Sequence, residues 1–74
     1  MRAEIEDFGT GWFGVRLGLR HQDIELLILR LEQLRVAPLG EHFHLRGNYQ
    51  GAGGVADVEI YLEEATAKNT LDLE

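Results

Sequence analysis

The fold of the second half of this chain is decided by two stretches, EHFHLR at residues 41–46 and VADVEIYL at residues 55–62. Both alternate polar and apolar residues with a period of two, which is typical of strands that bury one face. The segment between them, residues 47–54, contains four glycines and is expected to be a hairpin loop. The two stretches are therefore predicted to pair as an antiparallel hairpin.

Two histidines and two carboxylates are expected to share the solvent face of this hairpin. A register that pairs His44 with Asp57 and His42 with Glu59 keeps the apolar residues together on the other face, whereas a slip of one residue would expose them. Histidine and carboxylate are ligands for divalent transition metals such as zinc, iron, nickel or manganese. The same groups can transfer protons, and opposite charges across a sheet also stabilise it without binding anything. A metal site at these four residues, a catalytic site and a structural pairing all remain open.

The first half of the chain is expected to add a second hairpin and one helix. Residues 3–8 alternate weakly and residues 12–20 alternate clearly, with a glycine-rich turn between them. Apolar residues then recur at helical spacing over residues 22–36. The predicted fold is α+β, a two-layer ββαββ arrangement with one helix packed on a four-stranded, mostly antiparallel sheet. Residues 1–63 form this single domain, and residues 64–74 form a polar C-terminal tail or a short edge strand.

The predicted helix carries apolar residues on two sides. Leu26, Leu29 and Val36 lie nearly opposite the stripe that is expected to cover the sheet. A contiguous apolar strip on a small domain indicates an interface, so a homodimer or a protein partner is expected there. The alternative is that the tail, with Leu71 and Leu73, folds over this strip. The stripe that is expected to cover the sheet consists of Ile24, Leu27, Ile28, Leu31 and Leu34.

Three further residues are candidates for contact with a ligand or a partner. Asn48 and Tyr49 lie in the glycine-rich loop, and loops on rigid scaffolds often carry recognition. Trp12 lies beside Gly14 and Gly18 on the outer side of the predicted second strand. Glycines within a strand mark close approach of another group or a bulge. This surface is expected to form a groove or a contact with another chain; the alternative is that Trp12 caps the hairpin and the glycines mark bulges.

Composition excludes several classes of function. Thirteen acidic against seven basic residues give a net charge of −6, which repels nucleic acid. The chain has no cysteine, so disulfides and thiolate metal sites are excluded. No stretch approaches the roughly 20 apolar residues of a membrane span, and the acidic start does not match a signal peptide, so a cytoplasmic location is expected. The chain also has no serine, and no catalytic residue is assigned.

The stretches EHFHL at residues 41–45 and YQGAGGVADVEIY at residues 49–61 resemble a phrase in small uncharacterised bacterial proteins of about this length. That group has no established activity, so the resemblance implies a bacterial cytoplasmic protein and transfers no functional residue. The combined expectation is a small acidic, non-enzymatic interaction module that forms a homodimer. The alternative is a protein that binds a metal or a small ligand on the histidine and carboxylate face. A divalent transition metal is the only cofactor that the sequence suggests.

Overall fold

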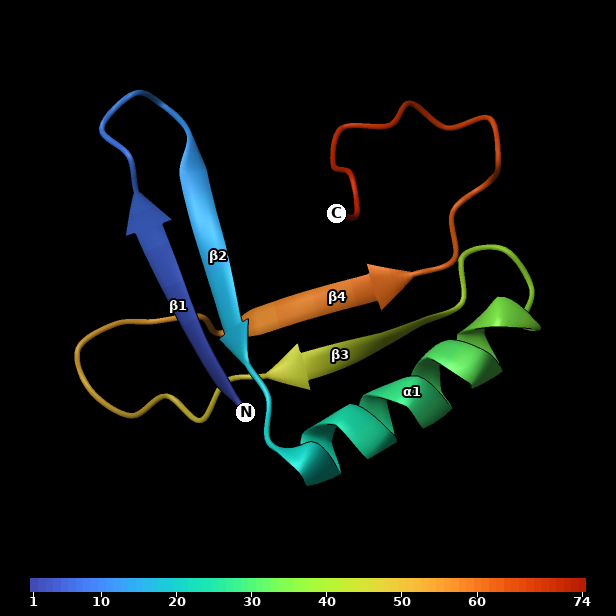
Figure 1. Ribbon diagram of the computed structural model, residues 1–74, viewed down its shortest axis with the longest axis horizontal. Coiled ribbons are helices and arrows are strands. Elements are labelled where there is room, and N and C mark those ends of the chain that lie inside the picture. Colours follow the sequence, from blue (N-terminus) through green and yellow to red (C-terminus); the bar gives the residue numbers. More distant parts are fainter.

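Two antiparallel hairpins and one helix make up the fold in a computed structural model that describes all residues 1–74 (Figure 1). The first hairpin consists of β1 (Arg2–Asp7) and β2 (Phe13–Gly18). Helix α1 (His21–Arg35) follows, and β3 (His42–Arg46) pairs with β4 (Asp57–Tyr61) in the second hairpin. The predicted α+β class and the order ββαββ are confirmed.

The predicted four-stranded sheet is wrong. Each hairpin is a separate two-stranded sheet, and no strand of one hairpin is hydrogen-bonded to a strand of the other. The β1–β2 hairpin, called the arm below, crosses the second hairpin near the N-terminus and projects away from it (Figure 1). Periodicity indicates which face a strand buries, but it carries no information on which strand edges meet. It therefore cannot distinguish one four-stranded sheet from two separate hairpins.

Glycines shape the tip of the arm. Gly9 and Gly11 adopt φ angles of 73° and 91°, a region that residues with a side chain seldom occupy. The backbone N–H of Gly9 donates a hydrogen bond of 2.8 Å to the carboxylate of Asp7. A Cβ atom at Gly14 would come within 2.9 Å of the ring of Phe8. Gly14 therefore makes room for this ring, and the continuous register of the two strands shows that it does not mark a bulge.

The arm has one charged face and one apolar face. On the charged face, Glu4 lies 2.9 Å from the guanidinium of Arg2 and 3.9 Å from that of Arg16. The opposite face carries Ala3, Ile5, Phe13, Val15 and Leu17, with Asp7 as its one charged residue. Ile5 and Val15 are directly paired across the strands, yet they are 58% and 61% exposed. Most of the apolar face of the arm is therefore uncovered within one chain; only at its base do Ala3 and Leu17 lie near the second hairpin.

Helix α1 begins at a cluster of charges around Asp23. The carboxylate of Asp23 accepts hydrogen bonds from the backbone N–H of Arg20 at 3.0 Å and from its guanidinium at 3.2 Å. The amino group of Met1 lies 2.9 Å from the same carboxylate. The Arg20 guanidinium and then the Met1 amine hold the pKa of Asp23 well below its usual range. This buried carboxylate thus joins the start of the helix to the start of β1.

Helix α1 runs alongside β3 and covers less surface than predicted (Figure 1). Leu34 is buried and Leu27 is half-buried, but the other three residues of the predicted stripe are exposed. A two-stranded hairpin is too narrow to cover a whole apolar stripe. In the entire chain, only Leu34 and Asp23 are buried.

The residues that follow β4 form neither helix nor strand. Leu71 and Leu73 are fully exposed, and the tail lies on the side of β4 away from α1 (Figure 1). The tail therefore does not cover Leu26, Leu29 and Val36. Helix α1 is neither long enough nor apolar enough to span a bilayer.

Replacing Asp23 with asparagine is expected to destabilise the protein, because the helix loses the carboxylate that accepts the hydrogen bonds from Arg20. The midpoint of thermal unfolding should fall by several degrees at neutral pH. Since folding lowers the pKa of Asp23, its contribution is present above the ordinary carboxyl pKa and is lost as the pH falls through the folded-state value. The difference between wild type and Asp23→Asn should therefore shrink in acid. Glu25→Gln, which removes a charge two residues later, is the control and should change little; equal effects of both variants would contradict this role.

Candidate functional site

The solvent face of the β3–β4 hairpin contains the predicted histidines and carboxylates, but the register differs from the prediction. His44 lies opposite Glu59, and His42 lies opposite Tyr61. The predicted pairs, His44 with Asp57 and His42 with Glu59, are wrong by two residues. A shift of two residues keeps every side chain on its face, so alternation alone cannot reveal it.

The loop sets the register. The backbone N–H of Gly47 donates a hydrogen bond of 2.8 Å to the carbonyl of Ala56, next to the last regular pair, Arg46 with Asp57. A Cβ atom at Gly47 would collide with the carbonyl oxygen of Val55. Only glycine permits this close approach of the two backbones, so the hairpin closes at this pair.

Three ligand atoms converge on the face from His42, His44 and Glu59. Oε1 of Glu59 lies 3.9 Å from Nε2 of His42 and 4.0 Å from Nε2 of His44. All three ligand atoms lie within 4.8 Å of one another. The two imidazole rings meet edge to face, with centroids 5.0 Å apart. This group could hold a divalent metal ion.

Asp57, the fourth residue of the predicted site, lies outside this group. Its two carboxylate oxygens are 2.9 Å and 3.1 Å from Nδ1 of His44. Nη1 of Arg46 lies 3.6 Å from Oδ1 of Asp57. The shifted register therefore makes Asp57 a hydrogen-bond partner of His44 and a charge partner of Arg46.

Tyr61 lies on the same face, opposite His42, and was not singled out from the sequence as a site residue. Its hydroxyl donates a hydrogen bond of 2.7 Å to Glu63. This carboxylate raises the pKa of Tyr61, and the hydroxyl in turn lowers the pKa of Glu63. The hydroxyl of Tyr61 is thus engaged by Glu63, and Tyr61 lies beside the three ligand atoms on this face. The sequence contains a signal for this contact, because the predicted strand has an outward-facing tyrosine two residues before a glutamate.

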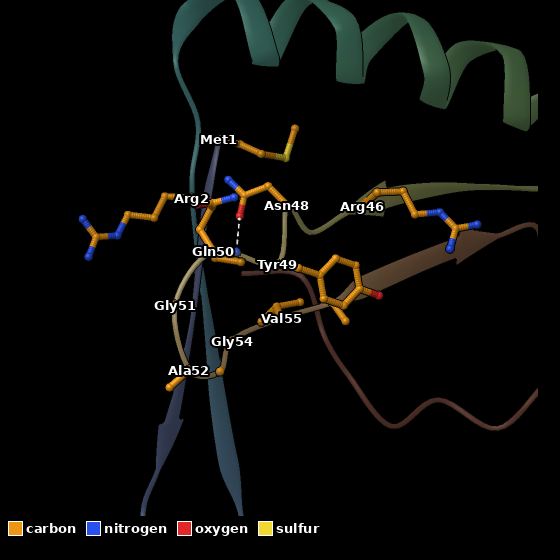
Figure 2. A pocket seen from close by; sticks show the side chains of 13 residues that line it. Met1, Arg2, Arg46, Asn48, Tyr49, Gln50, Gly51, Ala52, Gly54 and Val55 are labelled. Atoms are coloured by element: carbon orange, nitrogen blue, oxygen red, sulfur yellow. Dashed lines mark hydrogen bonds between the residues drawn. The ribbon is translucent and has the colours of Figure 1, made fainter.

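The loop candidates Asn48 and Tyr49 line a groove of about 630 Å³ between the β3–β4 loop and the start of β1 (Figure 2). The side chain of Asn48 accepts a hydrogen bond of 3.2 Å from the backbone N–H of Gln50 (Figure 2). Tyr49 has a φ angle of 57° and is 80% exposed. Trp12 lies at the tip of the arm and does not line the groove. The groove is formed by residues 1–3, Arg46 and residues 48–56.

The predicted interface residues Leu26, Leu29 and Val36 are all exposed. Because the prediction placed both hairpins in one four-stranded sheet, it missed the arm as a second exposed apolar surface. The alternation of residues 12–20 indicates that one face of this strand is buried. It does not indicate whether residues of the same chain or of another chain bury that face.

Titration of Tyr61 tests the hydrogen bond at the edge of this face. In a Tyr49→Phe background, which leaves one tyrosine, we expect the phenol to ionise above the ordinary value of about 10, because Glu63 accepts a hydrogen bond from the neutral hydroxyl and repels the phenolate. Adding Glu63→Gln should lower the titration midpoint, measured by ultraviolet absorbance against pH. Glu64→Gln is the matched control and should leave the midpoint in place. A midpoint that Glu63→Gln does not change would contradict the contact.

Comparison of the chain with protein-family models, with curated proteins and with solved structures finds no match. The resemblance to small bacterial proteins therefore stays a prediction. Three surfaces of this chain are candidates for a function: the uncovered apolar face of the arm, the exposed side of α1, and the histidine and carboxylate face of β3–β4.

Proposed function

We propose that this protein is a small, acidic, non-enzymatic interaction module whose working form is a homodimer. The observation that carries the proposal is the accessible surface of one chain, 6854 Å². A folded monomer of 8.4 kDa is expected to expose about 4,600 Å². Each copy thus exposes about 2,200 Å² more than a self-sufficient monomer of this mass, and burying that excess between two copies matches the area of obligate homodimers, roughly 2,000–5,000 Å² in total.

The dimensions of the chain support the same proposal. The radius of gyration is 14.2 Å, whereas a compact domain of this length is expected to have one of about 11 Å. The projecting arm, the β3–β4 loop and the tail all extend away from the centre of the molecule (Figure 1). A two-stranded hairpin on its own is at best marginally stable in water, so the arm requires cover that its own chain does not supply.

A second copy of the chain is the partner that fits best. The apolar face of the arm contains one charged residue, Asp7, among its apolar residues, so the net charge of −6 lies mainly on other surfaces. A two-fold axis would bring the same face of each copy together, as in most homodimers. The exposed strip of Leu26, Leu29 and Val36 provides a second apolar surface for the same assembly or for a different protein.

The open surface supports a role in binding rather than in catalysis. His42 and Glu59 are exposed on a sheet face, so water reaches both side chains freely. The only aliphatic hydroxyl groups that could act as nucleophiles belong to threonines, which lie in the turn of the arm and in the tail. The proposal includes a cytoplasmic location, which suits a chain without cysteine.

Val15→Glu tests the dimer directly. We expect the variant to lose the dimer in native mass spectrometry and sedimentation, because it places a charge in the centre of the apolar face of the arm. Arg16→Gln is the matched control: it changes the net charge by the same amount on the neighbouring residue, but on the charged face, and should remain dimeric. A monomeric wild type, or a Val15→Glu variant that stays dimeric, would contradict the proposed interface. Leu26→Glu in the same assay shows whether the exposed side of α1 also contributes.

Thermal unfolding should depend on protein concentration. If folding and dimerisation are coupled, the unfolding midpoint of the wild type rises as the concentration of protomers is raised. A self-sufficient monomer would show one midpoint at all concentrations. Circular dichroism at concentrations about a hundredfold apart measures this difference without any substitution.

A further inference from the structure

We infer that the solvent face of the β3–β4 hairpin binds one divalent transition-metal ion per chain, through Nε2 of His42, Nε2 of His44 and a carboxylate oxygen of Glu59. This inference is independent of the proposed dimer, because the dimer is proposed through the apolar face of the arm, whereas the three ligands lie on β3 and β4. The site would be completed by water at its remaining positions. Zinc is the ion that three nitrogen and oxygen ligands plus water suit best.

The paired strands bring the ligand atoms close to the spacing that a metal requires. His42 and His44 are two residues apart on β3, and Glu59 is directly opposite His44 on β4. The three ligand atoms lie within 4.8 Å of one another. Around tetrahedral zinc, with bonds of about 2.0–2.1 Å, ligand atoms are about 3.3 Å apart. Small side-chain rotations on a fixed backbone close that difference, since His42 and Glu59 are exposed and His44 is only half-buried.

The contacts of the two histidines leave the required nitrogen free. Nδ1 of His44 lies 2.9 Å from Asp57, and Nδ1 of His42 lies 3.5 Å from the carbonyl oxygen of Gly40. A neutral imidazole that donates its Nδ1 proton to an oxygen presents an unprotonated Nε2. In both residues this Nε2 faces Glu59. An acceptor behind a metal-binding histidine is the usual arrangement at protein metal sites, where it fixes the tautomer and the ring orientation.

The charges around the group favour a cation. Glu59 supplies one negative charge, and the nearby guanidinium of Arg46 is paired with Asp57 at 3.6 Å. The chain carries a net charge of −6, which attracts cations from solution. Two imidazoles and one carboxylate, without thiolates, suit zinc and other divalent transition metals better than calcium or magnesium.

Calorimetric titration of the untagged full chain with zinc chloride tests the site. We expect one zinc ion per chain for the wild type. The third histidine, His21, lies at the start of α1 and provides the control: His21→Ala should bind zinc as the wild type does. No uptake by the wild type, or one ion per two chains, would overturn a site contained within one chain.

Substitutions assign the roles. His44→Ala and Glu59→Gln should each lower the zinc affinity more than tenfold, since each removes a ligand. Asp57→Ala should lower it about 10–100-fold, as expected for the partner of a metal-binding histidine. Circular dichroism establishes that each variant is folded, and Glu59→Gln keeps the shape of the side chain if His44→Ala fails to fold. Binding that Glu59→Gln leaves unchanged would exclude Glu59 as a ligand and overturn the site.

Long-range ¹H–¹⁵N spectra of the histidine rings separate a positioning role of Asp57 from a purely structural one. Without metal, His44 should be the tautomer protonated at Nδ1, and zinc should shift the Nε2 resonances of His42 and His44 but not those of His21. Asp57→Ala should change the tautomer of His44 even before metal is added. Zinc shifts at His21, or none at His42 and His44, would contradict the proposed ligands.

Discussion

The structure depends on one constraint: its elements have more apolar surface than a single chain of this length can cover. The arm has one apolar face and α1 has apolar residues on two sides, yet only Leu34 and Asp23 are buried. Small domains bury a smaller share of their surface than large ones and often rely on oligomerisation. Separation of the two hairpins leaves most of the apolar face of the arm without a covering layer, and the homodimer proposed above would supply one.

The sequence predicted the local structure well because local structure follows from periodicity. The helix was expected at residues 22–36 and is observed at His21–Arg35, and all four strands lie where alternation placed them, with differences only at their ends. The long-range arrangement was not predictable in the same way. Polar and apolar residues would alternate in β2 in the same way whether this strand pairs with the second hairpin or has a free edge. The four-stranded sheet was therefore one of several arrangements compatible with the pattern.

The register of the second hairpin shows the same limit at the scale of the candidate site. Alternation correctly placed His42, His44, Asp57 and Glu59 on one face, but it could not distinguish registers that differ by two residues. Gly47 decides between them, because its lack of a side chain lets the backbone approach Val55 and Ala56. The chemical consequence is large. Glu59 now lies within reach of both histidines, whereas Asp57 moves behind His44 and pairs with Arg46.

The proposed metal site and the proposed dimer interface lie on different hairpins, the first on β3–β4 and the second on the arm. An ion held by His42 and His44 on β3 and by Glu59 on β4 would link the two strands across their hydrogen-bonded ladder. Binding to the folded hairpin and not to the unfolded chain stabilises the fold by mass action. The other side of those strands presents Phe43 and Ile60, which are only half-buried. A metal on the polar face would therefore hold β3 and β4 in register beneath the base of the arm, where Ala3 and Leu17 line a small cavity with Leu45 and Val58.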